Sequence, residues 1–251
     1  MRRAGCGASA LPVCLSTFMV VSVIIPTLNE ASYITDTLRT LRQQPGPIEP
    51  IVVDGGSTDA TVARARALAR VVHSKRGRGQ QMNRGADAAS GDALLFLHAD
   101  THLPPGGLDR VRATLARPDI ESGIFRLAFD APTPLLHLYS WCTRWPWIRL
   151  AFGDRALFAT AEAFHAVGGF PNWPLFEDLD LADRLHARGT FRFLPLSVTT
   201  SARRFRTNGA LRQQLRNLYL WFHYLRGTDP HRLADGYAYP NGSASGESAP
   251  T

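Results

Sequence analysis

Val20-Val-Ser-Val-Ile-Ile-Pro-Thr-Leu-Asn-Glu30 is the stretch that decides the fold of this 251-residue chain. Its first six residues are mostly β-branched and Pro26 closes the run, which predicts a buried strand followed by a polar turn. Over residues 31–43, isoleucine and leucine recur with the spacing of one helix face. A strand, a loop and a helix in this order are the first unit of an α/β fold.

The same alternation recurs further along the chain. Short apolar runs are followed by polar turns and then by segments with helical periodicity; Ser57 is placed to cap one of these helices and Gly91 to end another. Strands that alternate with helices in this way form a parallel, doubly wound sheet. The predicted strands cover residues 50–53, 71–73 and 93–97, and the predicted helices cover 58–69 and 80–89.

The second half of the chain is less regular and predicts a mixed-sheet extension. It includes a Pro- and Trp-rich segment up to about residue 150, and no internal repeat or linker requires a second domain. We therefore expect one domain over residues 19–240, with a first half at 19–100 and a second half at 101–240. The predicted strands of the second half cover residues 123–129, 157–159 and 191–196, and its predicted helices cover 179–187 and 209–225.

Composition and charge narrow the class of protein. The chain is 45% hydrophobic and 20% charged, as in ordinary soluble domains, and it has no apolar run of the roughly 20 residues that a membrane-spanning helix needs. Its formal charge of +7 comes chiefly from arginine and favours partners that bear phosphate, without choosing among nucleotides, anionic lipid and nucleic acid. The three cysteines are widely spaced and lack zinc-site spacing, which is typical of a reduced, cytoplasmic protein.

The two ends of the sequence differ in composition from the rest. Residues 1–18 resemble a crude signal peptide, although Pro12 interrupts the apolar stretch and Met19 stands just before the first strand. A functional leader and a start at Met19 are the two alternatives, so this extension need not be native. Residues 241–251 are rich in Gly, Ser, Ala and Pro, which predicts a disordered tail.

Polar residues stand directly after three of the predicted strands. The carboxyl ends of parallel strands meet at one crevice, so these side chains are expected to line a common ligand site. A single acid there would be weak evidence, because Asp and Ser also cap helices. The residues after the first strand are Asn29 and Glu30, those after the second are Asp54, Gly55, Ser57 and Asp59, and those after the fourth are His98 and Asp100.

Five segments carry a resemblance to a known family. They are Ser22-Val-Ile-Ile-Pro-Thr-Leu-Asn-Glu30, Val53-Asp-Gly-Gly-Ser-Thr-Asp59, Gly77-Arg-Gly-Gln-Gln-Met-Asn-Arg-Gly85, Leu97-His-Ala-Asp100 and Phe176-Glu-Asp-Leu-Asp180. In this order they resemble the family-2 glycosyltransferases of GT-A fold, and most closely the small bacterial branch found near arsenosugar and radical-SAM/selenodomain genes. The resemblance covers about residues 20–227.

The resemblance implies an activity and its partners. It implies inverting transfer of a sugar from a nucleoside-diphosphate donor of UDP or GDP type to a hydroxyl acceptor, lipid-linked or small, assisted by Mg²⁺ or Mn²⁺. Residues 19–100 then form the donor half and 101–240 the acceptor half, and nucleic acid is not expected as a partner. The residues implied to contact the donor are Pro26, Thr27, Asn29, Glu30, Asp54, Gly55, Ser57, Asp59, Arg78, Gly79, Asn83, His98 and Asp100.

Asp100 is the implied metal ligand, because hard divalent cations prefer carboxylate oxygen and complete their shell with diphosphate oxygens and water. The sequence departs here from the family's usual Asp-x-Asp, since His98 replaces the first acid. An imidazole at this position could ligate Mn²⁺, contact the ribose, or be a hydrogen-bonded structural residue.

Asp178 is implied to be the general base that takes the proton of the acceptor hydroxyl. The alternative is that acids at this place only complement a helix dipole. Glu177 and Asp154 are implied on the acceptor side, and Arg203 and Arg204 follow the late strand, where guanidinium groups could clamp the leaving diphosphate.

Three other classes of protein are alternatives to a glycosyltransferase. The full dinucleotide fingerprint is missing from the first strand–helix turn, which argues against an NAD-dependent dehydrogenase. A nucleotidyltransferase would carry a Gly-rich basic loop after the first strand, where this chain has Thr27-Leu-Asn-Glu30. A non-catalytic nucleotide-sugar-binding protein is the third alternative, suggested by His98.

The predicted C-terminal helix is amphipathic. An apolar stripe flanked by arginine packs on the domain in most proteins, and reversible contact with a membrane surface is the alternative, with the protein peripheral on the inner face of the membrane. Most of the tryptophans at 141, 145, 147 and 173 are expected to pack in the core, and the alternative is an exposed indole face that stacks on a sugar or a lipid. The stripe consists of Leu211, Leu215, Leu218, Phe222 and Leu225.

Overall fold

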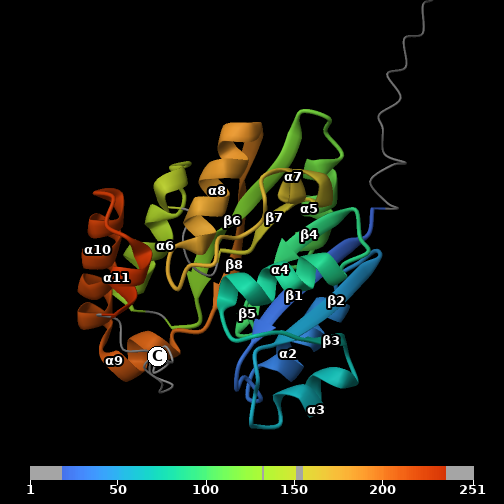
Figure 1. Ribbon diagram of the computed structural model, residues 1–251, viewed down its shortest axis with the longest axis horizontal. Coiled ribbons are helices and arrows are strands. Elements are labelled where there is room, and N and C mark those ends of the chain that lie inside the picture. Colours follow the sequence, from blue (N-terminus) through green and yellow to red (C-terminus); the bar gives the residue numbers. More distant parts are fainter. Residues whose placement is uncertain (1–18, 132, 151–154, 236–251) are drawn as a thin grey trace, which may run out of the picture.

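In the described part of the chain, one mixed sheet of eight strands, in the order β3-β2-β1-β4-β7-β6-β8-β5, carries helices on both faces (Figure 1). The structure, a computed structural model, describes residues 19–131, 133–150 and 155–235. The predicted N-terminal extension, the predicted tail and Asp154 lie outside these ranges. Within them, no helix is both long and apolar enough to cross a membrane.

The first half follows the predicted alternation. The central strand β1 pairs in parallel with β2 and with β4, and β2 pairs in parallel with β3. The carboxyl ends of these strands therefore lie along one edge. The elements are β1 (Val21–Thr27), α2 (Ile34–Arg42), β2 (Ile48–Asp54), α3 (Thr61–Arg66), β3 (Arg70–His73), α4 (Arg78–Ala88) and β4 (Ala93–Phe96).

The prediction for α3 was wrong at its start. The helix begins at Thr61, three residues after the predicted position, and Ser57 does not cap it. Asp59 accepts a hydrogen bond from the backbone N–H of Thr61, and this local turn occupies the residues that the prediction gave to the helix. The Ser57 hydroxyl instead accepts a hydrogen bond from the backbone N–H of Asn29.

The second half is the predicted mixed extension. β7 is antiparallel to β4 and to β6, β6 is parallel to β8, and β5 is antiparallel to β8. The elements are β5 (Thr101–His102), α5 (Gly107–Leu115), β6 (Ile120–Phe129), α6 (Pro134–Cys142), a short 3-10 helix (Ile148–Leu150), β7 (Leu157–Thr160), α7 (Ala161–Ala166), α8 (Glu177–Arg188), β8 (Thr190–Thr200), α9 (Arg203–Asn208), α10 (Ala210–Leu225) and α11 (Pro230–Asp235).

Several elements here were not predicted. α6 lies in the Pro- and Trp-rich segment, where Pro134 occupies the first turn and the Thr133 side chain accepts from the N–H of Leu136. Pro134 therefore stands at the start of a helix. β8 is longer than predicted and runs through Pro195, because its register with β6 shifts between Phe193 and Ser197. The other unpredicted elements are β5, α5, α7, α9 and α11.

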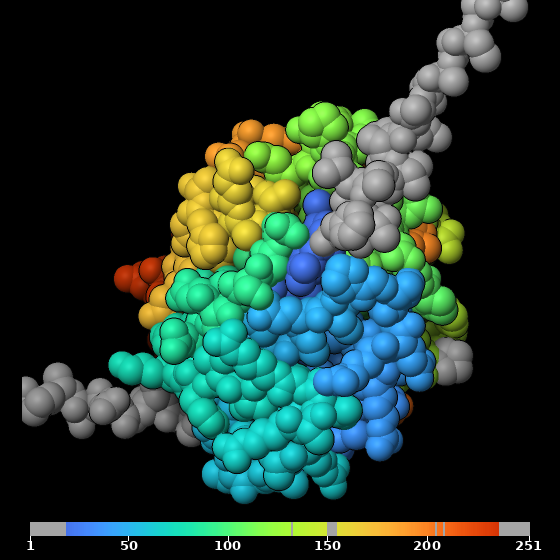
Figure 2. Space-filling view, turned by 90° about the vertical axis from the view of Figure 1, so that its right-hand side faces the viewer, coloured from blue at the N-terminus to red at the C-terminus, as the bar shows by residue number. Residues whose placement is uncertain are grey.

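Alternate residues of β1 point to opposite faces of the sheet, and both faces are buried. Val23 and Ile25 pack with α2 and α5 on one face, whereas Ile24 packs with α4, α7 and α8 on the other. Figure 2 shows the side on which the N-terminal segments, coloured blue to teal, pack as one continuous surface. The strands of the first half are thus held between two helical layers.

Gly85 sets how closely α4 approaches the sheet. A Cβ atom at this position would lie 2.4 Å from Cγ2 of Ile24 and 2.9 Å from Cγ2 of Val53. Both are buried strand side chains, so neither can move away freely. The absence of a side chain therefore brings the start of α4, with Arg78, close to the carboxyl ends of β1 and β2.

Gly85→Ala is expected to destabilise the protein by about 1–3 kcal/mol, because the added methyl group overpacks a filled core. Urea unfolding followed by circular dichroism measures this loss. Asp87→Ala, on the exposed side of the same helix, is the matched control and should change the free energy of unfolding by less than about 0.5 kcal/mol. Equal stability of Gly85→Ala and the wild type would contradict this account of the packing.

Candidate functional site

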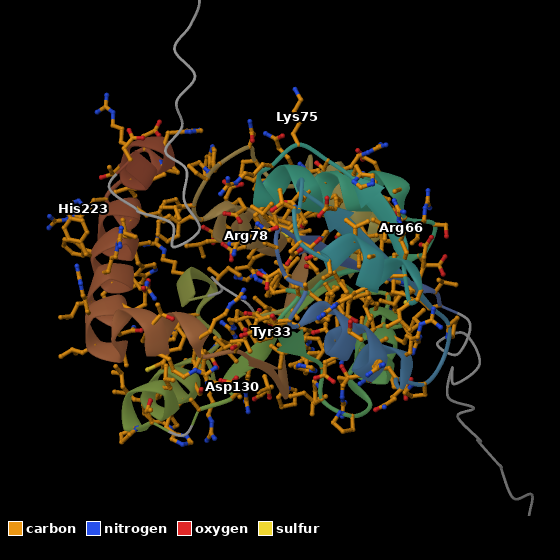
Figure 3. All side chains as sticks on the ribbon, turned by 90° about the horizontal axis from the view of Figure 1, so that it is seen from below. Tyr33, Arg66, Lys75, Arg78, Asp130 and His223 are labelled. Carbon is orange, nitrogen blue, oxygen red and sulfur yellow. The ribbon has the colours of Figure 1, made fainter. Side chains whose placement is uncertain are left out.

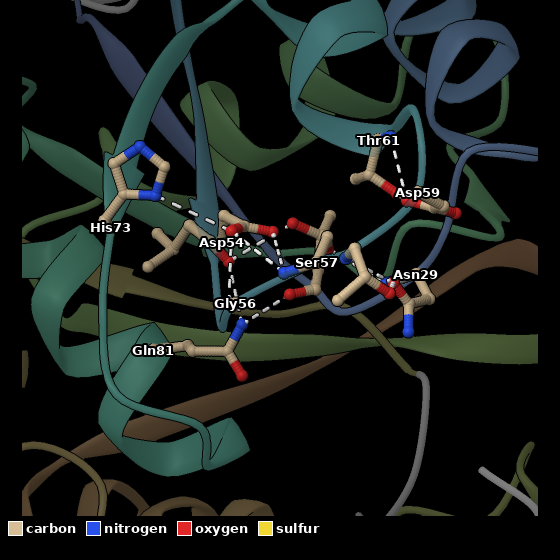
Figure 4. Close-up of polar contacts among 11 residues, drawn as sticks. Asn29, Asp54, Gly56, Ser57, Asp59, Thr61, His73 and Gln81 are labelled. Atoms are coloured by element: carbon tan, nitrogen blue, oxygen red, sulfur yellow. Dashed lines mark hydrogen bonds and ion pairs between the residues drawn. The ribbon is translucent and has the colours of Figure 1, made fainter.

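The loops after β1 and β2 form one wall (Figure 4). Asp54 is 3% exposed and accepts hydrogen bonds from the backbone N–H groups of Gly56 and Ser57, at 3.1 Å to the same carboxylate oxygen. His73 Nδ1 lies 3.6 Å from that oxygen. The buried carboxylate predicted to face the donor is therefore held at the carboxyl end of β2.

Asn29 and Asp59 connect this wall to the loop after β1. Asn29 has a left-handed backbone, with φ of 56°, and its Oδ1 accepts from the N–H of Thr58 at 2.9 Å. Asp59 accepts from the N–H groups of Ala31 and Thr61. Burial alone would raise the pKa of Asp59, but these hydrogen bonds and one from the Thr61 hydroxyl outweigh it and lower the pKa.

Gln81 connects the ends of β1 and β2. It was not among the predicted site residues. Its amide Nε2, on α4, donates to the carbonyl oxygens of Thr27 at 2.9 Å and Val53 at 2.8 Å. Thr27 and Pro26 are paired with β2 as the last residues of β1. A Cβ at Gly55 would lie 3.0 Å from the Gln81 amide. The absence of a side chain at Gly55 therefore leaves room for the Gln81 amide to reach both strand ends. Gln81 lies within the Gly77–Gly85 motif, which was the signal available for it.

Arg203 binds two acids that are far apart in the sequence. Its guanidinium pairs with both oxygens of Glu30, at 2.7 and 2.5 Å, and its Nε lies 3.1 Å from Oδ2 of Asp100. The Tyr33 ring packs against the guanidinium at 4.8 Å. Burial alone would lower the pKa of Arg203, but the Glu30 hydrogen bonds and the Asp100 charge raise it above its ordinary value.

The start of α8 forms a second charged group with Arg78 of α4. Arg78 pairs through Nε with Glu177, and its Nη2 lies 3.4 Å from Oδ2 of Asp178. Glu177 is 1% exposed, and its other carboxylate oxygen has no hydrogen-bond partner among the described residues. Phe176 before it has a left-handed backbone, with φ of 63°. Acids that were predicted to precede the helix form its first turn instead.

A small cavity of about 20 Å³ connects this group to the end of β4. Arg78, His98 and Asp178 all line it, so the histidine that replaces an acid lies beside the predicted base. In Figure 3, Arg78 and Tyr33 are both labelled near the middle of the view. The other lining residues are Met82, Phe96, Ala156, Leu157 and Phe170.

Asn83 and Gly79 hold the fold at this place. Both polar atoms of the Asn83 amide are paired at 2.9 Å with the backbone of Phe170, so the amide is already committed. A Cβ at Gly79 would lie 2.6 Å from the carbonyl oxygen of Pro171, so this glycine lets α4 pack against the loop before α8. For these two residues the geometry favours a structural role over the predicted donor contact.

The predicted site residues thus form a continuous band along one edge of the sheet. Hydrogen bonds link Asn29, Asp54 and Ser57, and Arg203 links Glu30 to Asp100. The cavity beside His98 leads on to Arg78 and Asp178. Arg204 lies in α9, with its side chain outside the described part, and Asp154 is outside it entirely.

Helix α10 packs against the turn that carries Asp178, the predicted base. Tyr224 of α10 stacks on Phe176 with ring centroids 4.6 Å apart. Burial, together with the charges of Asp180, Asp183 and Asp178, raises the pKa of Tyr224 to about 12. The sequence analysis did not single out Tyr224, since one tyrosine on a helix carries no signal of its own.

The fit of the site to a divalent cation rests on Asp100. No group of three His, Cys, Asp or Glu side chains within the described residues is arranged to hold a metal ion. Mg²⁺ and Mn²⁺ sites on nucleotides often use only one or two carboxylates, with phosphate oxygens and water in the other positions. Asp100 at the strand end, with Glu30 on the same guanidinium, fits such a shared site.

Comparisons with known proteins show the family of the chain. The family model described as Glycosyl transferase family 2 matches residues 22–170, which is more than half of the chain. The chain therefore belongs to glycosyltransferase family 2. It is 43% identical over 91 residues to a PGL/p-HBAD biosynthesis glycosyltransferase of Mycobacterium bovis, an alignment that covers 33% of this chain and 36% of that protein.

A second relative is the glucosyl-3-phosphoglycerate synthase of Mycolicibacterium smegmatis, 34% identical over 92 residues. That alignment covers 32% of this chain and 30% of the synthase. The chain thus spans about a third of the length of the curated relatives it matches.

Two solved structures show that the fold is shared. The mannosyltransferase PcManGT of Pyrobaculum calidifontis, in complex with GDP-Man and Mn²⁺, superposes with a TM-score of 0.58 at 24% identity, covering 72% of this chain and 56% of that one. TarS 1–349 of S. aureus, in complex with UDP-GlcNAc, superposes with a TM-score of 0.59 at 21% identity, covering 73% and 58%. The predicted α/β, GT-A fold is confirmed.

The Tyr224 contact predicts a pH dependence of stability. The native state keeps the phenol proton up to about pH 12, whereas the unfolded chain releases it near the ordinary tyrosine pKa of 10.0. The free energy of unfolding is therefore expected to fall as the pH rises from 10 to 12, and less steeply in Tyr224→Phe. Guanidinium unfolding at several pH values measures both slopes. Tyr219→Phe, on the exposed side of α10, is the control and should keep the wild-type slope.

Proposed function

We propose that this protein is an inverting glycosyltransferase that moves a sugar from a nucleoside-diphosphate donor to a hydroxyl acceptor. The supporting observation is that Arg78, His98 and Asp178, from three separate segments, line one cavity at the edge of the sheet. The nucleoside wall around Asp54 lies along the same edge. GDP-Man and UDP-GlcNAc are bound by the two solved structures of this fold, so we propose a UDP- or GDP-sugar here.

We assign the general base to Asp178. Single displacement with inversion needs a base on the face of the sugar opposite to the leaving diphosphate. The Asp178 carboxylate is 14% exposed and accepts from the N–H of Leu179 at 2.8 Å, so it is fixed in direction and still open to an acceptor. Arg78 keeps it in place, because the same guanidinium is anchored on buried Glu177.

The donor diphosphate is assigned to the region of Asp100 and Arg203. A divalent cation held by Asp100 would neutralise the charge that develops on the leaving diphosphate. Arg203 lies close enough to Asp100 to pair with phosphate oxygens as well, and the sequence analysis predicted this contact for it. The Leu97-His-Ala-Asp100 segment supports placing the chain in the small arsenosugar/selenodomain-associated branch.

Asp178→Asn is expected to lower the transfer rate by about 10³-fold while donor affinity stays within about threefold, because only the proton acceptor is lost. Single-turnover transfer and equilibrium binding of the donor separate the two quantities. Asp183→Asn, on the exposed side of the same helix, is the matched control and should transfer at the wild-type rate. A loss of only twofold in Asp178→Asn would overturn the assignment of the base.

Asp100→Asn is expected to remove the part of donor binding that depends on Mn²⁺ or Mg²⁺. In a thermal-shift screen of UDP-, GDP- and dTDP-sugars, a donor at a hundred times its Kd should stabilise the wild type by about 2.7 kcal/mol. Asp87→Asn, an exposed acid on α4, is the control and should keep the full metal-dependent shift. An unchanged metal dependence in Asp100→Asn would contradict its role as ligand.

The same measurements distinguish the alternative function of a nucleotide-sugar-binding protein without activity. His98 in place of an acid is the observation that favours this alternative. Such a protein would bind the donor but neither transfer nor slowly hydrolyse its sugar, with or without metal.

We further propose a cytoplasmic location, with α10 as a contact to the membrane surface.

A further inference from the structure

The large apolar side chains that are exposed in the described part of the chain come from two segments. Among the described residues, nine large apolar side chains are exposed, and all nine come from residues 138–147 and 211–222. Trp147 is 63% exposed and Leu211 is 64% exposed, so the expectation that the tryptophans pack in the core was wrong for this cluster. The nine are Leu138, Trp141, Trp145, Trp147, Leu211, Leu215, Leu218, Tyr219 and Phe222.

The two segments lie against each other and form one surface. α6 contacts α10, and the indole Nε1 of Trp221 in α10 donates to the carbonyl oxygen of Arg149 at 2.8 Å. Trp145 packs edge-on against Trp141 at 4.2 Å and stacks with Trp147 at 6.4 Å. We call the surface of residues 134–149 and 210–226 the α6–α10 face.

All charged side chains of Arg, Lys, Asp and Glu type on the α6–α10 face are positive. Its two segments contain five arginines and no Asp or Glu, in a chain whose net charge is +7. The Arg226 guanidinium lies 4.2 Å from the centre of the Phe222 ring, so charge and apolar surface are directly adjacent. The five are Arg144, Arg149, Arg212, Arg216 and Arg226.

A groove of about 730 Å³ opens on the same face between α6 and the outer ends of β6 and β8. Leu138 and Trp141 of the exposed cluster line it together with Arg126 and Arg144. An apolar wall beside two guanidinium groups suits an anionic amphiphile, whose chain would contact the tryptophan and whose phosphate would pair with arginine.

We propose that the α6–α10 face is a docking surface for an anionic lipid membrane. Aromatic side chains at the level of the headgroups, with arginines reaching the phosphates, are the chemistry of an interfacial protein segment. The inference extends the proposed membrane contact of α10 to a second, tryptophan-bearing segment and a groove. It does not depend on which sugar or nucleotide the protein binds.

A second copy of this chain fits the face less well. A two-fold dimer places the same patch against itself, so arginines would face arginines with no acid on either side. Anionic phospholipid supplies the missing negative charge. α9, which carries Arg203, leads directly into α10, so docking would place the candidate site beside the lipid surface.

Vesicle co-sedimentation with the full chain tests the proposal. Binding is expected to vesicles of phosphatidylglycerol mixed with phosphatidylcholine, to be much weaker with phosphatidylcholine alone, and to fall as salt is added. In the triple variant R144Q/R212Q/R226Q, the affinity for anionic vesicles should fall roughly a hundredfold, since each arginine near such a surface contributes a factor of roughly five. W147S/L215S should also weaken binding, because it removes inserted apolar surface.

The matched control is R66Q/K75Q, which removes two exposed charges at a distance from the face. Figure 3 shows Arg66 on the side of the molecule opposite to His223 of α10. This variant should bind vesicles nearly as the wild type does, and all variants should keep the wild-type circular dichroism spectrum.

Three results would overturn the proposal. The first is a wild-type protein that stays in the supernatant with anionic vesicles, and the second is a control that loses as much binding as the arginine triple variant. The third is concentration-dependent self-association in light scattering that W147S/L215S abolishes while vesicles bind nothing, which would make the face a protein interface.

Discussion

Several carboxylates converge on one edge of the sheet, and each needs a cation or a hydrogen-bond donor as partner. The arrangement of the rest of the site depends on these partners. Five acids with low exposure are gathered there, and their mutual repulsion in a partly buried place would oppose folding. Two arginines and a set of backbone N–H groups offset it. Arg203 bridges two loops and Arg78 bridges two helices, so the ion pairs also fix the distances across the band. The five acids are Glu30, Asp54, Asp100, Glu177 and Asp178.

The first half of the fold could be predicted because each of its units is local. The strand over Val21–Thr27 is a continuous apolar run that is buried on both faces, and α2 buries the apolar residues that recur with helical spacing. The second half could not be predicted to the same degree, because its elements depend on partners far away. β5 has only two residues and exists through pairing with β8, and α6 needed a proline to be interpreted as a helix start.

For the site, the sequence motifs predicted which residues would lie close together. They did not predict which of these residues would form ion pairs or hydrogen bonds with one another. Asp54 and Asp178 follow recognisable sequence patterns at element boundaries. Nothing in the sequence ties Arg203 to Glu30, which is 173 positions away, and Gln81 and Tyr224 act through backbone and ring contacts that carry no pattern. Asn83 is the opposite case. Its motif lies beside the site as predicted, but both polar atoms of its amide form hydrogen bonds with the backbone of Phe170. Long-range pairing is set by the complete fold, and local sequence does not encode it.

The two sides of α10 connect the candidate site to the molecular surface. Its inner side places Tyr224 on Phe176, immediately before the acids of α8, and its outer side presents leucines and arginines. The Tyr224 ring also contacts the Trp173 ring, so both ends of the short segment before α8 pack against α10. The turn that carries Asp178 therefore depends on the position of α10 as well as on the ion pairs of Arg78.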